Sequence, residues 1–336
     1  MGARRATIID VAQHAGVSWK TVSRVMNREA NVRPQTVAKV EAAIAALDFQ
    51  PNNAARTLAG TRSFLLGAIA DNPSAHYYMA LNRGGALACR ASGYHLALEE
   101  ISLGATGMLE EFERNLRRVR FDGVFLSPPV TDHIPLLDLL DRYGVRYVRL
   151  APAKQVDRSD SIFADDAVGV AALARHLWDL GHRRLGVVKG PPEHSASHVR
   201  LKSFLDEIER LGGDRSAVAL AQGDFSSASG LIAGRILLNG TDRPTAVFAS
   251  NDDMASGVVA AAGEAGLKVP AHLAVAGFDD SVVAGLVWPP LTTVRQPIEE
   301  FARIAVEMLL DPRKDEPVRR VVCPVELVIR RSTVAG

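Results

Sequence analysis

The sequence predicts a small all-α head, containing a helix-turn-helix, followed by a larger α/β core built on parallel sheets. The head is predicted from helix start and stop signals between Thr7 and Asn27. The core is predicted from short apolar runs that alternate with helical stretches from Phe64 onward. A chain of 336 residues, 47% of them hydrophobic, is long enough for two or three packed units.

The head begins with two short helices joined by a tight turn. Thr7 can cap the first helix, Asp10 lies in its first turn, Gly16 ends it and Ser18 caps the next helix. At about 100° per residue the second helix has two distinct faces. We expect one face to pack and the other to be free. The packed face holds Thr21, Val22 and Val25, and the free face holds Trp19, Lys20, Ser23 and Arg24.

A third helix completes the predicted head. Pro34 suits the first position of a helix because its missing N–H would have no partner there. An apolar stripe then recurs at intervals of three and four residues, which is the helical period. The stripe consists of Val37, Val40, Ile44 and Leu47. Three helices would therefore share one small core.

The charge of the chain is concentrated in the head. Residues 1–63 hold nine Lys and Arg against four Asp and Glu, a net of +5, so the remaining residues carry 30 minus 34, or −4. A basic head helps to neutralise phosphates, whereas contacts to base edges choose the DNA site. The alternative is a solvated basic face without a ligand. Because charge, capping and face geometry coincide here, DNA binding is the favoured interpretation.

The core is predicted from a repeated strand–helix rhythm. Continuous apolar strands separated by helices favour parallel sheets that are covered on both faces and bind ligands beyond the carboxyl ends of the strands. Two such sheets would face each other across a cleft. Late runs at 289–294 and 321–329 could return the chain between the two halves. The expected strands are residues 64–70, 94–98, 123–127, 147–151, 185–189, 217–220, 246–250 and 273–278.

Several other classes of protein do not fit the sequence. The N-terminus has no apolar signal-peptide core and no run approaches a membrane span, so we expect a cytoplasmic protein without a membrane partner. Cys89 and Cys323 lie far apart without His or Cys at metal-ligand spacing. We interpret them as packing thiols and expect no cofactor and no metal site.

Taken together, six segments resemble the LacI/GalR family of bacterial transcription regulators over essentially the whole chain. They are the helix-turn-helix, PNNAARTLAG at 51–60, HLWDLGHRRLG at 176–186, ASNDDMASG at 249–257, VAGFDDS at 275–281 and PPLTTVRQP at 289–297. The resemblance implies a DNA-binding head (1–50), a hinge helix with linker (51–62) and a periplasmic-binding-protein-like effector core (63–336). The core would comprise an N-subdomain (about 63–162 plus 292–321) and a C-subdomain (about 163–291 plus 322–336).

The resemblance implies a set of DNA-binding residues. Trp19, Lys20 and Arg24 match the base-reading positions of the recognition helix, and the two cations can donate to guanine O6 and N7. Short polar side chains suit phosphate anchoring: Thr7, Ser18, Thr21, Ser23 and Asn27. For Trp19 the alternative is a core residue.

A hinge helix is also implied, between residues 52 and 59. Leu58 matches an apolar wedge that enters the minor groove and kinks the duplex. Asn52, Ala55 and Arg56 would accompany it at the DNA. The alternative is an ordinary linker.

The effector site implied by the resemblance pairs a cation with polar and aromatic groups. Arg200 and Asp279 would bind sugar hydroxyls by donating and accepting hydrogen bonds, with Asn251 as a further polar ligand. Phe225, Tyr77 and Tyr78 match aromatic positions of the cleft. For Tyr77 and Phe225, packing in the core is the alternative.

The sequence departs from the family pattern at two places. Ala151 and Pro152 stand where many members have an aspartate that binds the effector. The first cleft loop, residues 71–76, also lacks the commoner pair of aromatics directly after proline. The effector therefore cannot be copied from a relative.

Several tempting catalytic motifs are discounted. The pairs Asp165–Asp166, Asp252–Asp253 and Asp279–Asp280 resemble paired carboxylates, but adjacent side chains point apart and one of each pair can cap a helix. We expect only Asp279 to be a ligand. His194 and His198 have helical spacing without a third metal ligand, so a polar cleft mouth is favoured. Ser195 and Ser197 lack a nucleophile elbow.

These observations predict a homodimeric repressor of carbohydrate-use genes, which is not an enzyme. Two recognition helices would enter major grooves roughly 34–36 Å apart, so the operator should be near-palindromic double-stranded DNA. A small sugar or sugar derivative would bind between the core subdomains. The rival interpretation is a sugar-binding or sugar-modifying protein that shares only the core fold.

Overall fold

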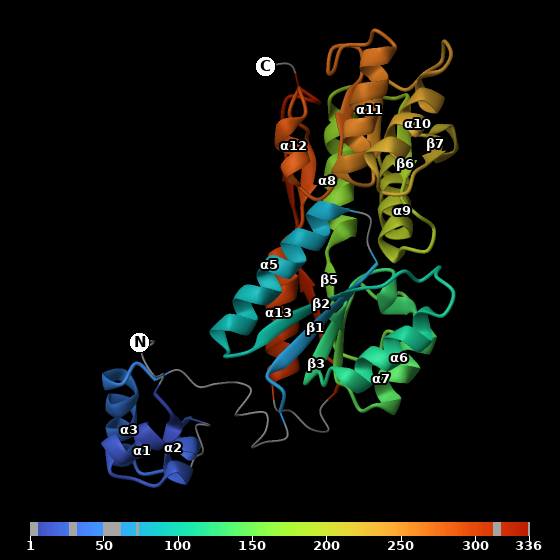
Figure 1. Ribbon diagram of the computed structural model, residues 1–336. Helices are drawn as coiled ribbons and strands as arrows, with labels where there is room; N and C mark the ends of the chain where they lie inside the picture. Colours follow the sequence, from blue (N-terminus) through green and yellow to red (C-terminus); the bar gives the residue numbers. More distant parts are fainter. Residues whose placement is uncertain (1–5, 27–31, 50–61, 72–73, 312–316, 335–336) are drawn as a thin grey trace. The chain divides into compact units, whose positions relative to one another are not determined.

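The computed structural model describes residues 6–26, 32–49, 62–71, 74–311 and 317–334 (Figure 1). The chain divides into two compact units, Met1–Phe64 and Leu65–Gly336. In the described residues no helix combines the length and the apolar character that crossing a membrane would require.

The head consists of α1 (Ile8–Ala15), α2 (Trp19–Met26) and α3 (Pro34–Ala46). Thr7 and Asp10 form a capping box at the start of α1, and Gly16 ends this helix with φ +66°, a conformation that glycine adopts without strain. The Ser18 Oγ accepts a hydrogen bond from the Thr21 N–H. The buried side chains of the head are Val11, Ala12, Val22, Val25, Val40, Ala43 and Phe49. These features confirm the predicted three-helix core.

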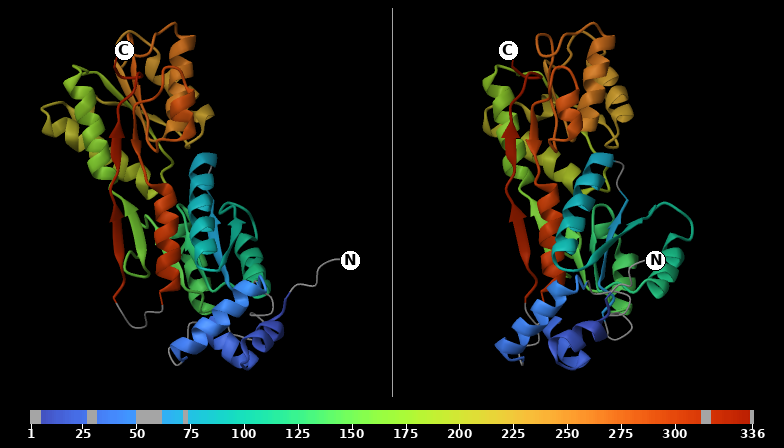
Figure 2. Two further views of the ribbon diagram at one scale, coloured as in Figure 1. Left: turned by 90° about the vertical axis from the view of Figure 1, so that its left-hand side faces the viewer. Right: turned by 60° about the vertical axis from the view of Figure 1, so that its left-hand side comes forward.

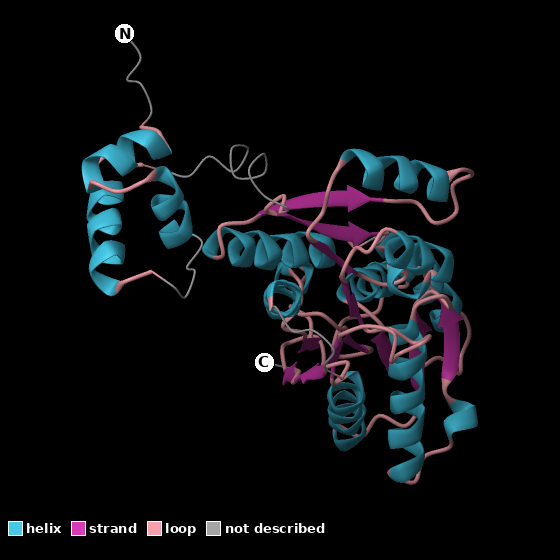
Figure 3. Cartoon of the chain, turned by 90° about the horizontal axis from the view of Figure 1, so that it is seen from below, coloured by secondary structure: helices cyan, strands magenta, loops and turns pink. Residues whose placement is uncertain are grey.

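The first part of the larger unit, the N-subdomain, contains a six-stranded parallel sheet. Its strand order is β11-β5-β4-β3-β1-β2. Helices α5 (Ala75–Ala91) and α13 (Ile298–Leu310) pack together on one face, and α6 (Met108–Arg118) and α7 (Ile134–Arg142) cover the other. Figure 3 shows helices on either side of the strands. The strands are β1 (Leu65–Ala70), β2 (His95–Glu100), β3 (Gly123–Leu126), β4 (Tyr147–Leu150), β5 (Ser161–Ala164) and β11 (Arg320–Cys323).

The C-subdomain contains a four-stranded parallel sheet in the order β7-β6-β8-β9. Successive residues of β6 face opposite sides, as the strand period requires: Val187 packs with α8 and α9, and Val188 with α10 and α11. The strands are β6 (Leu185–Lys189), β7 (Ala219–Gln222), β8 (Ala246–Ala249) and β9 (Ala274–Ala276). The helices are α8 (Asp166–Asp179), α9 (Ser195–Arg210), α10 (Ser227–Leu238), α11 (Asp252–Glu264) and α12 (Val282–Leu286).

The chain passes three times between the subdomains. It leaves the first sheet through β5, returns from β10 (Thr293–Arg295) into α13, and crosses again from β11 to β12 (Glu326–Val328). Strands β10 and β12 pair antiparallel at the crossing. Figure 2 shows β11 and β12 in line, in red, running from one subdomain to the other. The two late apolar runs therefore return the chain as predicted.

The observed strands agree with the predicted rhythm, with two differences. Strand β7 begins at Ala219 because a 3-10 turn occupies Arg215–Ala217. Strand β5 was not predicted, because it has only four residues and follows a polar stretch. Cys89 and Cys323 are buried free thiols. The fold class is confirmed, while the predicted hinge helix at 51–62 falls almost entirely outside the described residues.

Candidate functional site

The exposed face of α2 carries the three predicted base-reading residues. Trp19 is 53% exposed, and Lys20 and Arg24 are exposed as well. Val22 and Val25 on the opposite face are buried, so the core alternative for Trp19 is wrong. The Lys20 Nζ lies 5.9 Å from the centroid of the Trp19 ring, which is within cation–π distance.

Short polar residues surround this face, and several are already hydrogen-bonded within the head. The Thr7 hydroxyl donates to Asp10 at 2.7 Å, and the hydroxyls of Ser18 and Thr21 lie 2.9 Å apart. Ser23 is half-buried. Asn27, Asn52, Ala55, Arg56 and Leu58, which were also predicted to bind DNA, lie outside the described residues.

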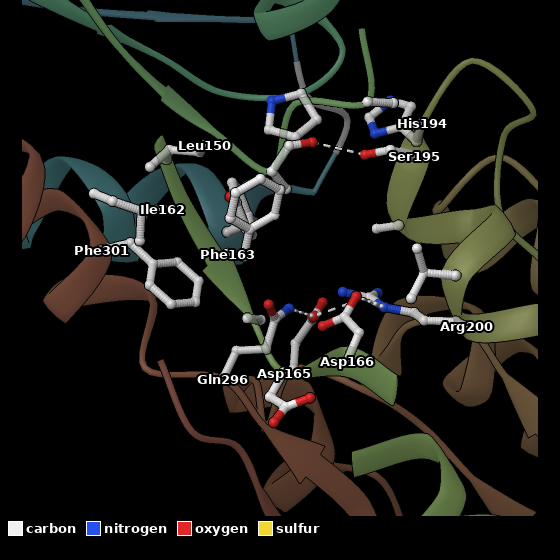
Figure 4. Close-up of a pocket in the computed structure, with 18 of the residues that line it drawn as sticks. Leu150, Ile162, Phe163, Asp165, Asp166, His194, Ser195, Arg200, Gln296 and Phe301 are labelled. Carbon is white, nitrogen blue, oxygen red and sulfur yellow. Dashed lines mark hydrogen bonds and ion pairs between the residues drawn. The ribbon is translucent and has the colours of Figure 1, made fainter. Parts of the chain in front are cut away.

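A cavity of about 430 Å³ lies between the two core subdomains (Figure 4). Its volume falls within the range of roughly 300–1,000 Å³ that is typical of small-molecule sites. Five of the six predicted effector residues line it: Tyr77, Arg200, Phe225, Asn251 and Asp279. Tyr78 does not, although it neighbours Tyr77 on α5, because successive helical residues point in different directions.

Arg200 on α9 is the centre of the polar part of the cavity. Its Nε donates to Asp166 Oδ2 at 3.0 Å, and its Nη1 donates to the Ser250 carbonyl at 2.7 Å. The Nη1 also lies 3.9 Å from Asp279 Oδ1. The guanidinium stacks over the Phe278 ring, 3.7 Å from its centroid. Arg200 is only 5% exposed, so these contacts fix its orientation before any ligand binds.

Two buried carboxylates flank this arginine. Burial raises the pKa of Asp279 to about 7, although Arg200 and the hydrogen bond from Gln296 act in the opposite direction. Burial also raises the pKa of Asp166, again against the attraction of Arg200. Asp166 Oδ1 is buried and has no hydrogen-bond partner among the described residues. This oxygen can accept a hydrogen bond from a ligand hydroxyl.

Aromatic rings form the next part of the lining. Phe225 has φ +70° and is 6% exposed, and its ring meets the His194 ring edge-on with centroids 5.1 Å apart. Burial lowers the pKa of His194 to about 4, so this imidazole is neutral at pH 7. Burial likewise raises the pKa of Tyr77, whose phenol stays protonated.

Asn251 lies in the lining, but most of its amide is already bonded within the protein. Its Oδ1 accepts from the Met254 N–H at 2.9 Å and caps α11, and its Nδ2 donates to the Phe225 carbonyl at 2.9 Å. Asn251 therefore holds the α11 terminus and the Phe225 loop in place. Few hydrogen-bonding positions on this side chain are therefore left for a ligand.

The three pairs of adjacent aspartates take partly different roles from those predicted. Asp165 caps α8 as predicted and also belongs to the cavity lining, while its neighbour Asp166 lies in the lining and binds Arg200. The expectation that only Asp279 among these residues would reach the ligand site is therefore wrong. The reason is that α8 begins between the two residues, so their side chains point in different directions. In the second pair Asn251, not an aspartate, caps α11.

The histidine pair also separates. His194 lines the cavity, whereas the His198 Nε2 lies 2.7 Å from the Pro192 carbonyl on the surface. Among the described residues, no group of three or more His, Cys, Asp or Glu side chains is arranged to hold a metal ion. Sequence reasoning also missed Gln296 and the apolar side of the cavity, which includes Leu150, Ile162 and Phe301.

Comparisons with known proteins agree with this architecture. Residues 7–52 match the model of bacterial regulatory proteins of the lacI family, and residues 174–333 match a periplasmic binding protein-like domain. The HTH-type transcriptional repressor PurR of Proteus mirabilis is 35% identical, with 98% of each chain covered. The ribose operon repressor of Escherichia coli is 35% identical, covering 91% of this chain and 92% of the repressor.

A solved structure gives the same answer for the fold. The lac repressor dimer bound to operator and the anti-inducer ONPF matches with a TM-score of 0.77 at 29% identity, and the match covers 99% of this chain and all of that one. An exposed recognition-helix face, a cavity between two parallel-sheet subdomains and relatives that match over 98% and 92% of their length thus coincide. The chain belongs to the lacI family of bacterial regulatory proteins.

Proposed function

We propose that this protein is a homodimeric repressor that binds near-palindromic operator DNA in front of carbohydrate-use genes. A small sugar-like effector in the cavity between the core subdomains would control its affinity for DNA. The relatives are named as repressors, one of them of a ribose operon, and the related lac repressor structure is a dimer on its operator.

The exposed face of α2 is the observation that carries the DNA-binding part of this proposal. A helix fits the major groove, where each base pair presents a distinct pattern of donors and acceptors. Lys20 and Arg24 can donate to guanine, and Trp19 offers an apolar surface for a thymine methyl. Burying three such side chains on DNA requires a groove that matches them, and this requirement produces sequence selectivity.

The polar cluster around Arg200 supports a hydroxylated effector. Its guanidinium donates, while Asp166 Oδ1 and Asp279 accept, which is the combination that sugar hydroxyls need. Binding would change DNA affinity only as far as the effector prefers one arrangement of the subdomains over the other. An effector with such a preference can either release the protein from DNA or promote its binding to DNA.

A selection experiment tests the proposed function. The full-length protein is incubated with a pool of random-sequence duplexes, and the bound DNA is recovered and sequenced over several rounds. We expect a near-palindromic motif, whose affinity falls as the salt concentration rises. If no motif is recovered, and the DNA from the last round binds no more tightly than random duplexes in a gel-shift assay, sequence-specific regulation is ruled out.

A further inference from the structure

We infer that the effector is an uncharged glycoside with an apolar aglycone, instead of a free sugar or a sugar phosphate. This inference rests on the proposed function, because it names the ligand of the same cavity. It depends on three observations: the cavity has two chemically different sides, the side chains of its apolar side carry no polar atoms, and its charged groups are mostly acidic.

The cavity has a polar side and an apolar side. Asp166, Arg200 and Asp279 belong to the polar side, which the C-subdomain provides. The opposite side, here called the apolar wall, consists of Leu150, Ile162, Phe163, Phe301 and Val322. Figure 4 shows Leu150, Ile162 and Phe301 together, across the cavity from Arg200 and Asp166. One cavity includes both sides, so a single ligand can contact both.

Four elements of the N-subdomain contribute to the apolar wall: three strands of its sheet and one helix packed on that sheet. Leu150 ends β4, Ile162 and Phe163 belong to β5, Phe301 lies on α13 and Val322 on β11. Leu150 and Ile162 are only 1% exposed, and Phe301 is 4% exposed. These three side chains are therefore fixed by the packing of the sheet and α13, while the more exposed Phe163 and Val322 offer most of the accessible apolar surface.

Hydroxyl groups placed against this wall would lose water without gaining a partner, which is unfavourable. The nearest loop does not compensate. At Ala151 the N–H donates to the Ile162 carbonyl at 2.8 Å, and the carbonyl accepts from the Ser195 hydroxyl at 2.8 Å. A ligand that fills the cavity therefore needs an apolar group on this side and hydroxyls on the other.

The charges of the lining disfavour an anionic ligand. One cation, Arg200, faces three aspartates in the lining, of which Asp166 and Asp279 are its direct neighbours. The lining contains no lysine, and His194 is neutral at pH 7. A phosphate or carboxylate group would therefore meet like charges instead of an open guanidinium. An uncharged head group avoids this repulsion.

Calorimetry with matched ligands tests the inference. The full-length protein is titrated with methyl and phenyl glycosides of glucose, galactose and xylose, in both anomers, and with the 6-phosphates of the hexosides. For each sugar that binds, we expect the phenyl glycoside to bind about tenfold or more tightly than the methyl glycoside, because its ring buries apolar area on the wall. The 6-phosphates should bind more weakly than their uncharged counterparts.

Variants of the wall make the test specific. Phe163→Ser and Val322→Thr should reduce the ratio of phenyl to methyl affinity, because the phenyl ring loses more apolar contact than the methyl group does. Retained methyl-glycoside binding shows that each variant is folded. Val168→Thr is the matched control, since Val168 is 60% exposed on α8 and does not line the cavity. It should leave the ratio unchanged.

Several outcomes would overturn the inference. These are equal or tighter binding of the methyl glycosides, tighter binding of a 6-phosphate, preference for cellobiose over phenyl glucoside, or a response to adenosine and uridine with none to any glycoside. If none of these glycosides binds but the protein still selects a DNA motif, the effector class is wrong and the repressor function stands. If it selects no motif, the proposed function fails whatever the glycosides do.

Discussion

At the scale of single residues, Arg200 is held by several different kinds of contact. A carboxylate, a main-chain carbonyl and an aromatic face fix its guanidinium, and a second carboxylate lies nearby. A charged group that is already held in one orientation loses little conformational entropy when a ligand binds. The sequence placed Arg200 and Asp279 in this site, but nothing in the sequence indicated Asp166 as the direct partner of the arginine.

Replacing Arg200 tests its role in binding. Arg200→Ala should abolish the response to the effector while operator binding is retained, because the head makes the DNA contacts. Arg200→Lys keeps the charge but loses the planar fork, so it should restore little of the affinity. Calorimetry measures the ligand and gel shifts measure the DNA. Unchanged ligand affinity in Arg200→Ala would refute the assignment.

The choice of DNA site is a second property that single residues decide. Arg24→Ala should cost about 1–3 kcal/mol on the selected motif, because a guanine contact is lost, and much less on random DNA. The measurement is a pair of gel-shift titrations at one salt concentration. Lys39→Ala on α3 is the control, since an exposed cation off the α2 face should affect both DNAs alike. Equal losses for Arg24→Ala on both DNAs would contradict a base-reading role.

The raised pKa of Asp279 predicts a pH dependence of stability. The unfolded chain loses this proton near the ordinary pKa of 3.8, whereas the folded protein holds it up to a pKa of about 7. The folded state therefore binds more protons in this window, and its free energy of unfolding falls as pH rises. Asp279→Asn lacks this proton. Its stability relative to the wild type, measured by urea unfolding, should rise from pH 4 to pH 7, and a constant difference would disprove the shift.

At the scale of elements, the C-subdomain depends on a close crossing of two helices. Gly230 on α10 and Gly257 on α11 lie where the helices touch, and a Cβ at position 257 would collide with the Ser227 carbonyl oxygen. A Cβ at position 230 would collide with the Met254 carbonyl oxygen. Because both obstacles are backbone atoms, a larger residue must push the helices apart.

The crossing predicts opposite effects for two glycines of the same helix. Gly257→Ala should lower the free energy of unfolding by about 1–3 kcal/mol, because overpacking forces backbone shifts. Gly263→Ala, where a Cβ meets nothing within 4 Å, should raise it by about 0.5–1 kcal/mol through the higher helix propensity of alanine. Urea unfolding measures both. A neutral Gly257→Ala would show that the helices can separate without cost.

The helices of the head were the elements most accessible to sequence reasoning. Thr7, Asp10, Gly16 and Pro34 each act on backbone groups within a few residues, so their effect is local. Strand β5 was missed for the opposite reason. Its four residues become a strand because β4 and β11 flank them, and strand pairing of this kind depends on partners far away in the chain.

At the scale of the whole core, two hydrogen bonds between described residues join the subdomains across the cavity. The Ser74 hydroxyl at the start of α5 donates to Asp253 Oδ2 on α11 at 3.0 Å, and the Ser195 hydroxyl donates to the Ala151 carbonyl. Both connect elements of different sheets. They therefore stabilise the observed arrangement of the subdomains, in which the polar side and the apolar wall line one cavity.

Removing one of these bonds should weaken ligand binding. Asp253 does not line the cavity, but its Oδ2 accepts from Ser74 and also, at 3.4 Å, from the Asn251 Nδ2, so Asp253→Ala removes both bonds. A net hydrogen bond contributes about 0.5–1.5 kcal/mol, which corresponds to about a twofold to tenfold loss of effector affinity in calorimetry. Ser227→Ala breaks a hydroxyl contact within the C-subdomain and should have no effect. An unaltered affinity in Asp253→Ala would mean that closure does not depend on this bond.

The sequence by itself determined the helical head, the strand rhythm of the core, the family and the cavity residues Tyr77, Arg200, Asn251 and Asp279. Capping and periodicity act over a few residues, and the family segments 249–257 and 275–281 include the carboxyl ends of β8 and β9 and contain Asn251 and Asp279. Only the tertiary structure decided that Asp166 faces the cavity, that the Asn251 amide caps a helix, and that an apolar wall lies opposite Arg200. The wall joins β4, β5, α13 and β11, which are distant in sequence, and no local signal specifies which of their faces meet.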